Sequence, residues 1–167
     1  MGTNPTKAMD NIYCRCRKEA AKYNDKLNSR EGAAELLGVS VSSLADYELG
    51  NTKVVPVDKV VLMADLYNAP ELKNYYCTHE CPIGEGTVHK LEVAELDRLT
   101  IKLLAALRNM TGIKDAIIDI AADGTVNDLE RLKFNEVLNA LDSMAIHSQE
   151  LRLWAEKNLR QKEGERR

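Results

Sequence analysis

The sequence predicts an all-α protein with two helical parts, and three observations lead to that class. Apolar residues recur every three or four positions, which is the spacing of one helix face, and strand-like alternation is absent. The segment 77–90, rich in glycine, proline and threonine, interrupts this pattern. Short helices are expected before that segment and long ones after it. We therefore expect a domain over residues 1–81, a linker over 82–90, a second helical domain over 91–160 and a charged, frayed tail over 161–167.

Local signals place five helices before the interruption. A first helix is expected from Asn11 to Tyr23, with an apolar face made of Ile12, Cys16, Ala20 and Tyr23. Ser29 is a candidate N-cap for a helix through Leu37, and Gly38 suits the positive φ that follows a helix end. Ser40 is expected to cap the next helix, which Gly50 ends.

Two prolines open the remaining helices of this part, because a proline at a helix start loses no hydrogen bond. Pro56 begins a helix whose expected inner face is Val60, Val61, Ala64 and Leu66 or Tyr67. Pro70 begins a fifth helix through about Tyr76.

Three apolar patterns follow the interruption and predict a helical hairpin or bundle. Leu96, Leu99, Leu103, Leu107 and Met110 share one face of a long helix, a second helix runs from Ile113 to Ala122, and a last long helix carries Leu132, Val137, Leu141, Met144, Leu151 and Trp154. These faces can close one intramolecular bundle, pair two chains, or do both. They could also receive a protein partner.

Composition is that of an ordinary globular chain. Of the 167 residues, 44% are hydrophobic and 29% are charged. A chain of this length can bury a core without disulfide bonds. No apolar run approaches the roughly 18 residues of a membrane span, and the N-terminus lacks the apolar stretch expected of a signal peptide. We expect no membrane association and a cytoplasmic location, where cysteines are thiols or metal ligands.

The net charge of −3 argues against a protein that coats nucleic acid, but basic residues gather near the N-terminus. Residues 1–30 carry seven basic side chains against three acidic ones. The basic ones are Lys7, Arg15, Arg17, Lys18, Lys22, Lys26 and Arg30. A solvated helix face and contact with phosphate both explain this distribution.

The stretch SREGAAELLGVSVSSLADYELGNTKVVPVDKVVLMADLYN resembles the lambda-repressor-like (Cro/repressor, XRE) helix-turn-helix family. The shared features are Ala34 in the second helix, the turn LGVS, Leu44 in the third helix, YELG at its end and P-V-x-x-V opening the fourth. The resemblance covers about residues 10–76. It implies a five-helix repressor-like DNA-binding domain, and a transcriptional regulator that acts as a homodimer on a palindromic operator.

The resemblance also implies which residues meet double-stranded DNA. Val41, Ser42 and Asp46 match positions that face base edges, Ser43 lies near the backbone, and Arg30, Asn51, Thr52 and Lys53 match phosphate-contacting positions. The sequence departs from the pattern on the reading face, where many family members carry arginine, glutamine, lysine or asparagine. Val41 and Ser42 discriminate weakly between bases. Use of the same fold as a protein-interaction module without DNA is the alternative.

Cysteine and histidine residues form a possible metal or redox site. Cys77, His79 and Cys81 lie within five residues, and the expected fold makes the first and fifth helices neighbours, so that Cys16, with Cys14 as a further candidate, could approach them. Zinc or an iron–sulfur cluster would suit such ligands and would make the regulator metal- or redox-responsive. The C-x-H-x-C spacing is unlike a zinc knuckle, and Cys16 also suits a small core residue. Unless this cluster binds metal, we expect no cofactor.

The sequence gives little support for calcium binding or for enzymatic activity. The segment DIAADGTVNDLE, residues 119–130, is similar to a calcium-binding EF-hand loop, but Ala121 removes one oxygen ligand. A helical hairpin, in which Gly124 ends one helix and Thr125 or Asn127 caps the next, is the simpler interpretation. His79, His89 and His147 have no catalytic partner at motif spacing, so we expect no enzymatic activity.

Overall fold

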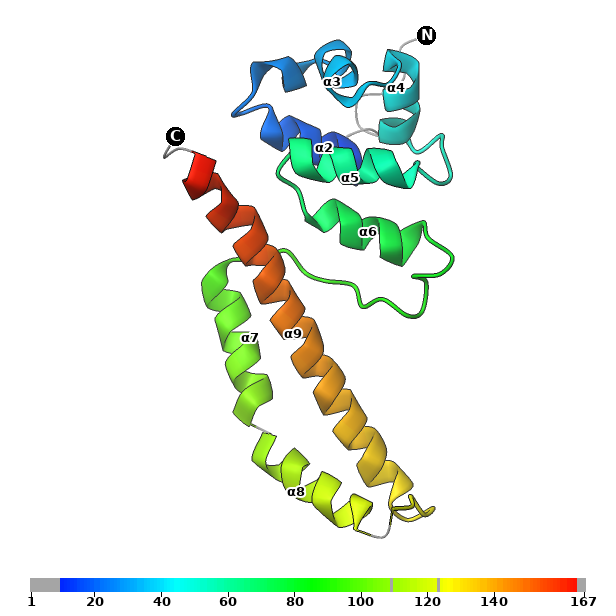
Figure 1. Cartoon of the computed structure of the whole chain (residues 1–167), viewed down its shortest axis with the longest axis vertical. Coiled ribbons are helices and arrows are strands. Elements are labelled where there is room, and N and C mark those ends of the chain that lie inside the picture. Colours follow the sequence, from blue (N-terminus) through cyan, green and yellow to red (C-terminus); the bar gives the residue numbers. More distant parts are fainter. Residues whose placement is uncertain (1–9, 109, 123, 165–167) are drawn as a thin grey trace. The chain divides into compact units, whose positions relative to one another are not determined.

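A computed structural model describes residues 10–108, 110–122 and 124–164, which form helices and contain no strand (Figure 1). The predicted all-α class is therefore confirmed. The chain divides into two compact units, residues 1–90 and 91–167. Within the described ranges, no helix combines the length and apolar character needed to cross a membrane.

The first unit is built of short helices around one apolar core. In chain order its elements are α2 (Ile12–Ala20), the 3₁₀ helix η1 (Asp25–Asn28), α3 (Arg30–Leu37), α4 (Val41–Leu49), α5 (Val57–Leu66) and α6 (Glu71–His79). The side chains of Leu27, Leu44, Met63 and Leu72 are completely buried in the core. This core therefore joins η1, α4, α5 and α6.

Capping explains where α3 and α4 begin and end, and it confirms the predicted caps. The Ser29 hydroxyl accepts the Gly32 N–H, and the Ser40 hydroxyl accepts the Ser43 N–H. Gly38 and Gly50 follow the two helices with φ of 61° and 71°, the left-handed conformation that glycine tolerates best. These caps limit α3 and α4 to about two turns each.

The buried faces of two helices differ from the predicted ones. The helix predicted to reach Tyr23 ends at Ala20, and Tyr23 is 83% exposed. The buried face of α2 also contains Tyr13 and Arg17, which the predicted face lacked. In α5, Met63 is buried whereas Val61 is exposed. Helical spacing predicted these buried faces only in part, because the neighbouring elements determine which side of a helix is covered.

The segment predicted as a linker belongs to the first unit. Helix α6 continues to His79, and residues 82–90 pack back onto it. A Cβ atom on Gly84 would lie 2.1 Å from the Cys77 carbonyl oxygen, so only glycine fits this approach. The Asn74 side-chain amide also donates a hydrogen bond to the His89 carbonyl at 2.9 Å.

The second unit consists of α7 (Leu96–Arg108) and α8 (Met110–Ala121) packed along α9 (Arg131–Gly164) (Figure 1). Ile113, Ala116 and Val137 form the core between α8 and α9. Leu132, which was predicted to lie on the apolar face of the last helix, is 77% exposed. Helix α9 continues to Gly164, where a frayed tail was predicted, and residues 165–167 lie outside the described part of the chain.

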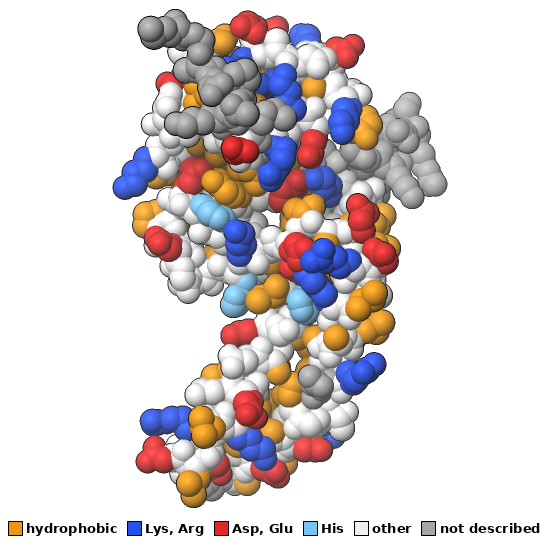
Figure 2. Space-filling model, turned by 180° about the vertical axis from the view of Figure 1, so that it is seen from behind, with side chains coloured by type: hydrophobic (Ala, Val, Ile, Leu, Met, Phe, Trp, Pro, Cys, Tyr) orange, Lys and Arg blue, Asp and Glu red, His pale blue; other side chains and the backbone are white. Residues whose placement is uncertain are grey.

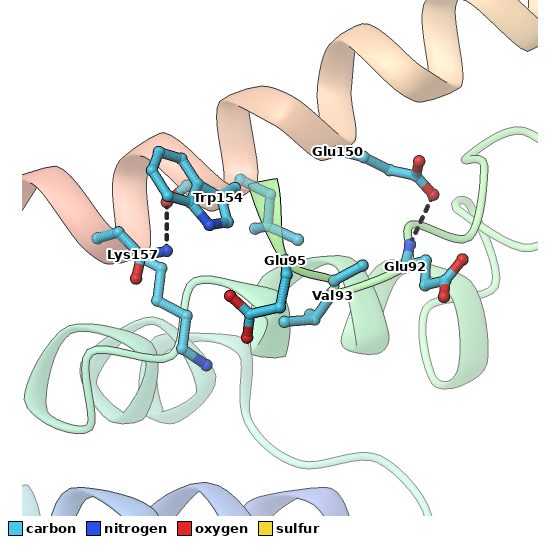
Figure 3. Close-up of a pocket in the computed structure, with 9 residues that line it drawn as sticks. Glu92, Val93, Glu95, Glu150, Trp154 and Lys157 are labelled. Carbon is cyan, nitrogen blue, oxygen red and sulfur yellow. Dashed lines mark hydrogen bonds between the residues drawn. The ribbon is translucent and has the colours of Figure 1, made fainter. Parts of the chain in front are cut away.

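The segment before α7 is anchored on α9 by a buried carboxylate. Glu150 is 3% exposed and accepts the Glu92 N–H at 2.9 Å, and His147 Nδ1 lies 3.0 Å from the same carboxylate. A small cavity of about 210 Å³ lies between this segment and α9, beside Val93, Glu95, Trp154 and Lys157 (Figure 3). This anchor fixes the position from which α7 begins.

The loop between α8 and α9 caps the helical turn that leads into α9. The Asn127 side-chain oxygen accepts the N–H groups of Leu129 and Glu130, and the Glu130 carboxylate accepts the Asn127 N–H at 3.1 Å. Helix α8 ends at Ala121, three residues before the stop predicted at Gly124, which lies in the loop with a φ of 74°. This reciprocal capping confirms the predicted hairpin and engages the glutamate that an EF-hand would direct at calcium.

Replacement of Gly32 by alanine is expected to destabilise the first unit. A Cβ atom there would lie 2.2 Å from the Lys26 carbonyl oxygen, so α3 and η1 would have to separate. We expect Gly32→Ala to lower the free energy of unfolding by about 1–3 kcal/mol in urea denaturation followed by circular dichroism. Gly112→Ala is the control: a Cβ atom on this glycine of α8 would meet nothing within 4 Å. It should stabilise the protein by about 0.5–1 kcal/mol. Equal stability of the two variants would contradict the close approach.

Candidate nucleic-acid interface

Helix α4 presents its first turn at the surface while its other side is buried. Leu44 and Glu48 have no exposed surface, whereas Val41 is 40% exposed. Ser42 and Asp46 are exposed as well. The three residues predicted to face base edges therefore lie on the accessible side of α4.

The hydroxyl groups at the start of α4 form a short network. Ser40 Oγ lies 2.9 Å from Ser42 Oγ and 2.7 Å from Ser43 Oγ, and it also accepts the Ser43 N–H. Each hydroxyl offers one donor and two acceptor positions. The Ser42 hydroxyl can thus remain in this network and still bond to a polar group outside the protein.

The end of α4 holds the loop that was predicted to contact phosphate. Asp46 Oδ1 accepts the Asn51 side-chain amide at 3.0 Å, and the Asp46 carbonyl accepts the N–H groups of Asn51 and Thr52. Lys53 follows and is exposed. A base that bonded to Asp46 would compete with the Asn51 side chain for the carboxylate. Recognition of a base by Asp46 would therefore be weak.

Glu48 binds two arginines in the interior of the first unit. Arg17 donates Nε to Glu48 Oε1 at 2.5 Å and Nη2 to Oε2 at 2.9 Å, and Arg30 donates Nε to Oε2 at 2.7 Å. The remaining Arg17 donor, Nη1, binds the Leu27 carbonyl oxygen at 2.8 Å. These bonds connect α2, η1, α3 and α4 at one point.

This cluster was not foreseen, and it corrects the expected role of one basic residue. Arg17 was counted among the surface cations, but it is 2% exposed and its charge is used inside the unit. One signal existed, since Arg17 lies one turn from both Tyr13 and Ala21 on the buried side of α2. Arg30 has a shared role: its Nε binds Glu48, while its side chain remains 32% exposed.

The charges of the cluster stabilise each other. Burial raises the pKa of Glu48, but the hydrogen bonds from Arg17 and Arg30 outweigh it and hold the pKa below the ordinary value. Burial lowers the pKa of Arg17, and the bond to Glu48 more than reverses this. Both groups are therefore charged at neutral pH. Burial, together with the charge of Glu48, raises the pKa of the neighbouring Cys14 thiol.

A second carboxylate supports the loop after α4. Glu80 accepts the Tyr13 hydroxyl at 2.7 Å through one oxygen and the Val55 N–H at 2.8 Å through the other. Burial and the bond to Glu80 raise the pKa of Tyr13, so its hydroxyl stays protonated and donates. Residues after Lys53 are thereby tied to α2 and to the end of α6.

The predicted metal ligands do not form a recognisable metal site. Cys16 is buried in the core, while Cys77 and Cys81 are half-buried at the end of α6. The exposed His79 stacks on Tyr75 with ring centroids 4.3 Å apart. Among the described residues, no three histidine, cysteine, aspartate or glutamate side chains are grouped to hold a metal ion. Metal binding by Cys16, Cys77, His79 and Cys81 stays a prediction from the sequence.

Comparison with known proteins does not assign the chain to a family. No family model, no curated protein and no solved structure matches the chain. The functional interpretation therefore depends on the residues and contacts of α3, α4 and the loop that follows them.

Removal of the Glu48 charge is expected to destabilise the first unit strongly. Glu48→Gln would leave two buried or partly buried guanidinium groups without their carboxylate, a change that typically costs about 3–5 kcal/mol. Urea denaturation at neutral pH measures this loss. Glu35→Gln is the matched control, because Glu35 is exposed and its nearest cation, Lys26, is 3.7 Å away. A loss below about 1 kcal/mol in both variants would show that the cluster does not hold the unit together.

The same cluster predicts a loss of stability in acid. The pKa of Glu48 is lower in the folded protein than in the unfolded chain, where it is about 4.3. Its contribution is therefore complete above that pH and declines as the pH falls through the lower, folded value. In a series of denaturation curves from pH 6 downward, Glu48→Gln should flatten the decline that the wild type shows. A variant with an unchanged pH dependence would contradict the assignment.

Proposed function

We propose that the first unit binds double-stranded DNA as a repressor-like helix-turn-helix, with α4 in the major groove, and that the protein is a transcriptional regulator. The observation that carries this proposal is the exposed first turn of α4, held in a fixed position by the bonds of Glu48 to Arg17 and Arg30. A reading helix must be both accessible and rigidly placed, because base contacts depend on its depth in the groove.

The connection between α3 and α4 supports the proposal. Gly38 adopts a left-handed conformation, and the Val39 N–H donates to the Ala34 carbonyl, which closes a tight turn. Ala34 is 2% exposed and belongs to the apolar core, so a small residue is buried at this part of α3. A short turn with a small residue at the crossing is what a helix-turn-helix needs.

The chemistry of the surface indicates how DNA would be recognised. Val41 can contact a thymine methyl group, and the Ser42 hydroxyl can bond to several bases. Lys53 and the accessible part of Arg30 can neutralise phosphate charge. Because no residue on α4 offers a bidentate purine contact, one unit would bind modestly. Two half-sites on a palindromic operator would then be needed for useful affinity.

A protein-interaction module is the second candidate. The absence of arginine and lysine from α4, together with the net charge of −3, favours it. The same exposed turn of α4 would then contact another protein. Binding to DNA separates the two candidates.

The first experiment is DNA binding by fluorescence anisotropy over a range of salt concentrations. The full chain is titrated against a duplex from the region flanking its own gene and against a scrambled duplex. We expect tighter binding to the first duplex and a steep decrease with salt. Lys53→Ala should weaken binding to both duplexes alike and lower the salt slope by about one. Val41→Ala and Ser42→Ala should chiefly reduce the preference for the flanking duplex.

The control removes the same charge elsewhere. Lys114 is exposed on α8 of the second unit, so Lys114→Ala should leave binding unchanged. Weak, equal binding to the two duplexes would contradict the proposal and favour the interaction module. An effect of Lys114→Ala as large as that of Lys53→Ala would show that binding is not localised to the first unit.

A further inference from the structure

Helix α7 has apolar side chains on two sides, and only one side is covered. Leu99 is 1% exposed where α7 packs on α9. On the outer side Ile101 is 68% and Leu104 60% exposed, while Leu96 and Leu107, which were predicted to share the face of Leu99, are each 42% exposed. Hydrophobic side chains are visible along this edge of the second unit in the space-filling view (Figure 2). Single exposed apolar residues are ordinary, but Ile101 and Leu104 lie on adjacent turns of one helix face and indicate a contact surface.

Charged residues of opposite sign close the two ends of this surface. Asp97 lies four residues before Ile101, and Arg108 lies four residues after Leu104. The spacing of four, three and four places all four on one helix face, as in the seam of a coiled coil. Both charged residues are exposed, and neither forms an ion pair within the described residues. We define Asp97, Ile101, Leu104 and Arg108 as the outer seam of α7.

The outer seam is complementary to itself. Its four positions are symmetric about the midpoint between Lys102 and Leu103. In an antiparallel pair related by a two-fold axis, Ile101 would face Leu104 of the partner subunit, and Asp97 would face Arg108 of the partner subunit. A parallel pair would instead oppose like charges at both ends. The order of the charges therefore selects the antiparallel arrangement.

We propose that two copies of this chain pair through the outer seams of α7 in antiparallel orientation. A seam of one short helix buries less than the roughly 800 Å² per partner of a standard interface. The dimer should therefore be reversible, with a Kd on the order of micromolar. Such a dimer would supply the second half-site contact of the proposed regulator, but it does not require DNA.

Sedimentation equilibrium of the full chain without DNA tests the pairing. The wild type should be a reversible dimer, and Leu104→Glu should raise the Kd at least about tenfold because it buries a charge against Ile101 of the partner subunit. Asp97→Arg alone and Arg108→Asp alone should each weaken the dimer about tenfold, since each opposes like charges twice. The double variant Asp97→Arg/Arg108→Asp should regain the wild-type Kd within about twofold.

The control is Leu132→Glu, which should not change the Kd because this leucine of α9 lies outside the outer seam and is even more exposed than Leu104, at 77% against 60%. A wild type that stays monomeric at tens of micromolar would overturn the inference, and so would a double variant as weak as the single ones. The charge exchanges affect exposed residues, so circular dichroism should confirm that the variants remain folded. A dimer that fails to bind DNA would refute the proposed function and leave the pairing intact. A protein that binds DNA but stays monomeric would refute the pairing and leave the proposed function intact.

Discussion

The carboxylate of Glu48, buried between two guanidinium groups, determines how the helices of the first unit are placed. An ion pair in the interior gains little net stability, because both charges give up hydration. Its effect is positional. The planar arginine forks accept only a narrow range of carboxylate orientations. Glu48 therefore sets α4 against α2, η1 and α3, and a displacement of any one of these elements would leave a charge unpaired in the core. The exposed turn of α4 takes its precision from a contact on the opposite side of the helix.

These internal bonds also determine which charged groups near α4 remain available to bind a ligand. Arg17 is neutralised within the unit, Arg30 shares its guanidinium with Glu48, and Asp46 is engaged by Asn51. Helix α4 itself carries no arginine or lysine. Recognition would have to come from apolar and hydroxyl contacts and from the fixed geometry of the helix, with affinity gained by combining two subunits. The proposed pairing through the outer seam of α7 would supply that second subunit.

Local chemistry was sufficient to predict the all-α class and the ends of α3 and α4, and long-range contacts account for what was missed. The signals from Ser29, Ser40 and Gly38 lie within a turn of the helix ends they define, so α3 and α4 were predicted closely. The surface positions of Val41, Ser42 and Asp46 agree with the expectation that came from the family resemblance. Arg17 and Glu48, by contrast, are 31 residues apart, and no local pattern pairs them. Tyr23 and Leu132 were assigned to covered faces because spacing tells which residues share a face, not which face another helix covers.

The bonds of Glu80 bear on how the first unit can be isolated. The resemblance to repressor-like domains ends near residue 76, which would suggest a fragment cut there. That fragment would lose the acceptor for the Tyr13 hydroxyl and for the Val55 N–H, and with it the packing of Gly84 against Cys77. The loop carrying Asn51 to Lys53 would then be released from its support on α6. A recombinant first unit should accordingly extend to Lys90. If a shorter fragment bound DNA weakly, the cause would be the loosened loop and not the absence of the residues on α4.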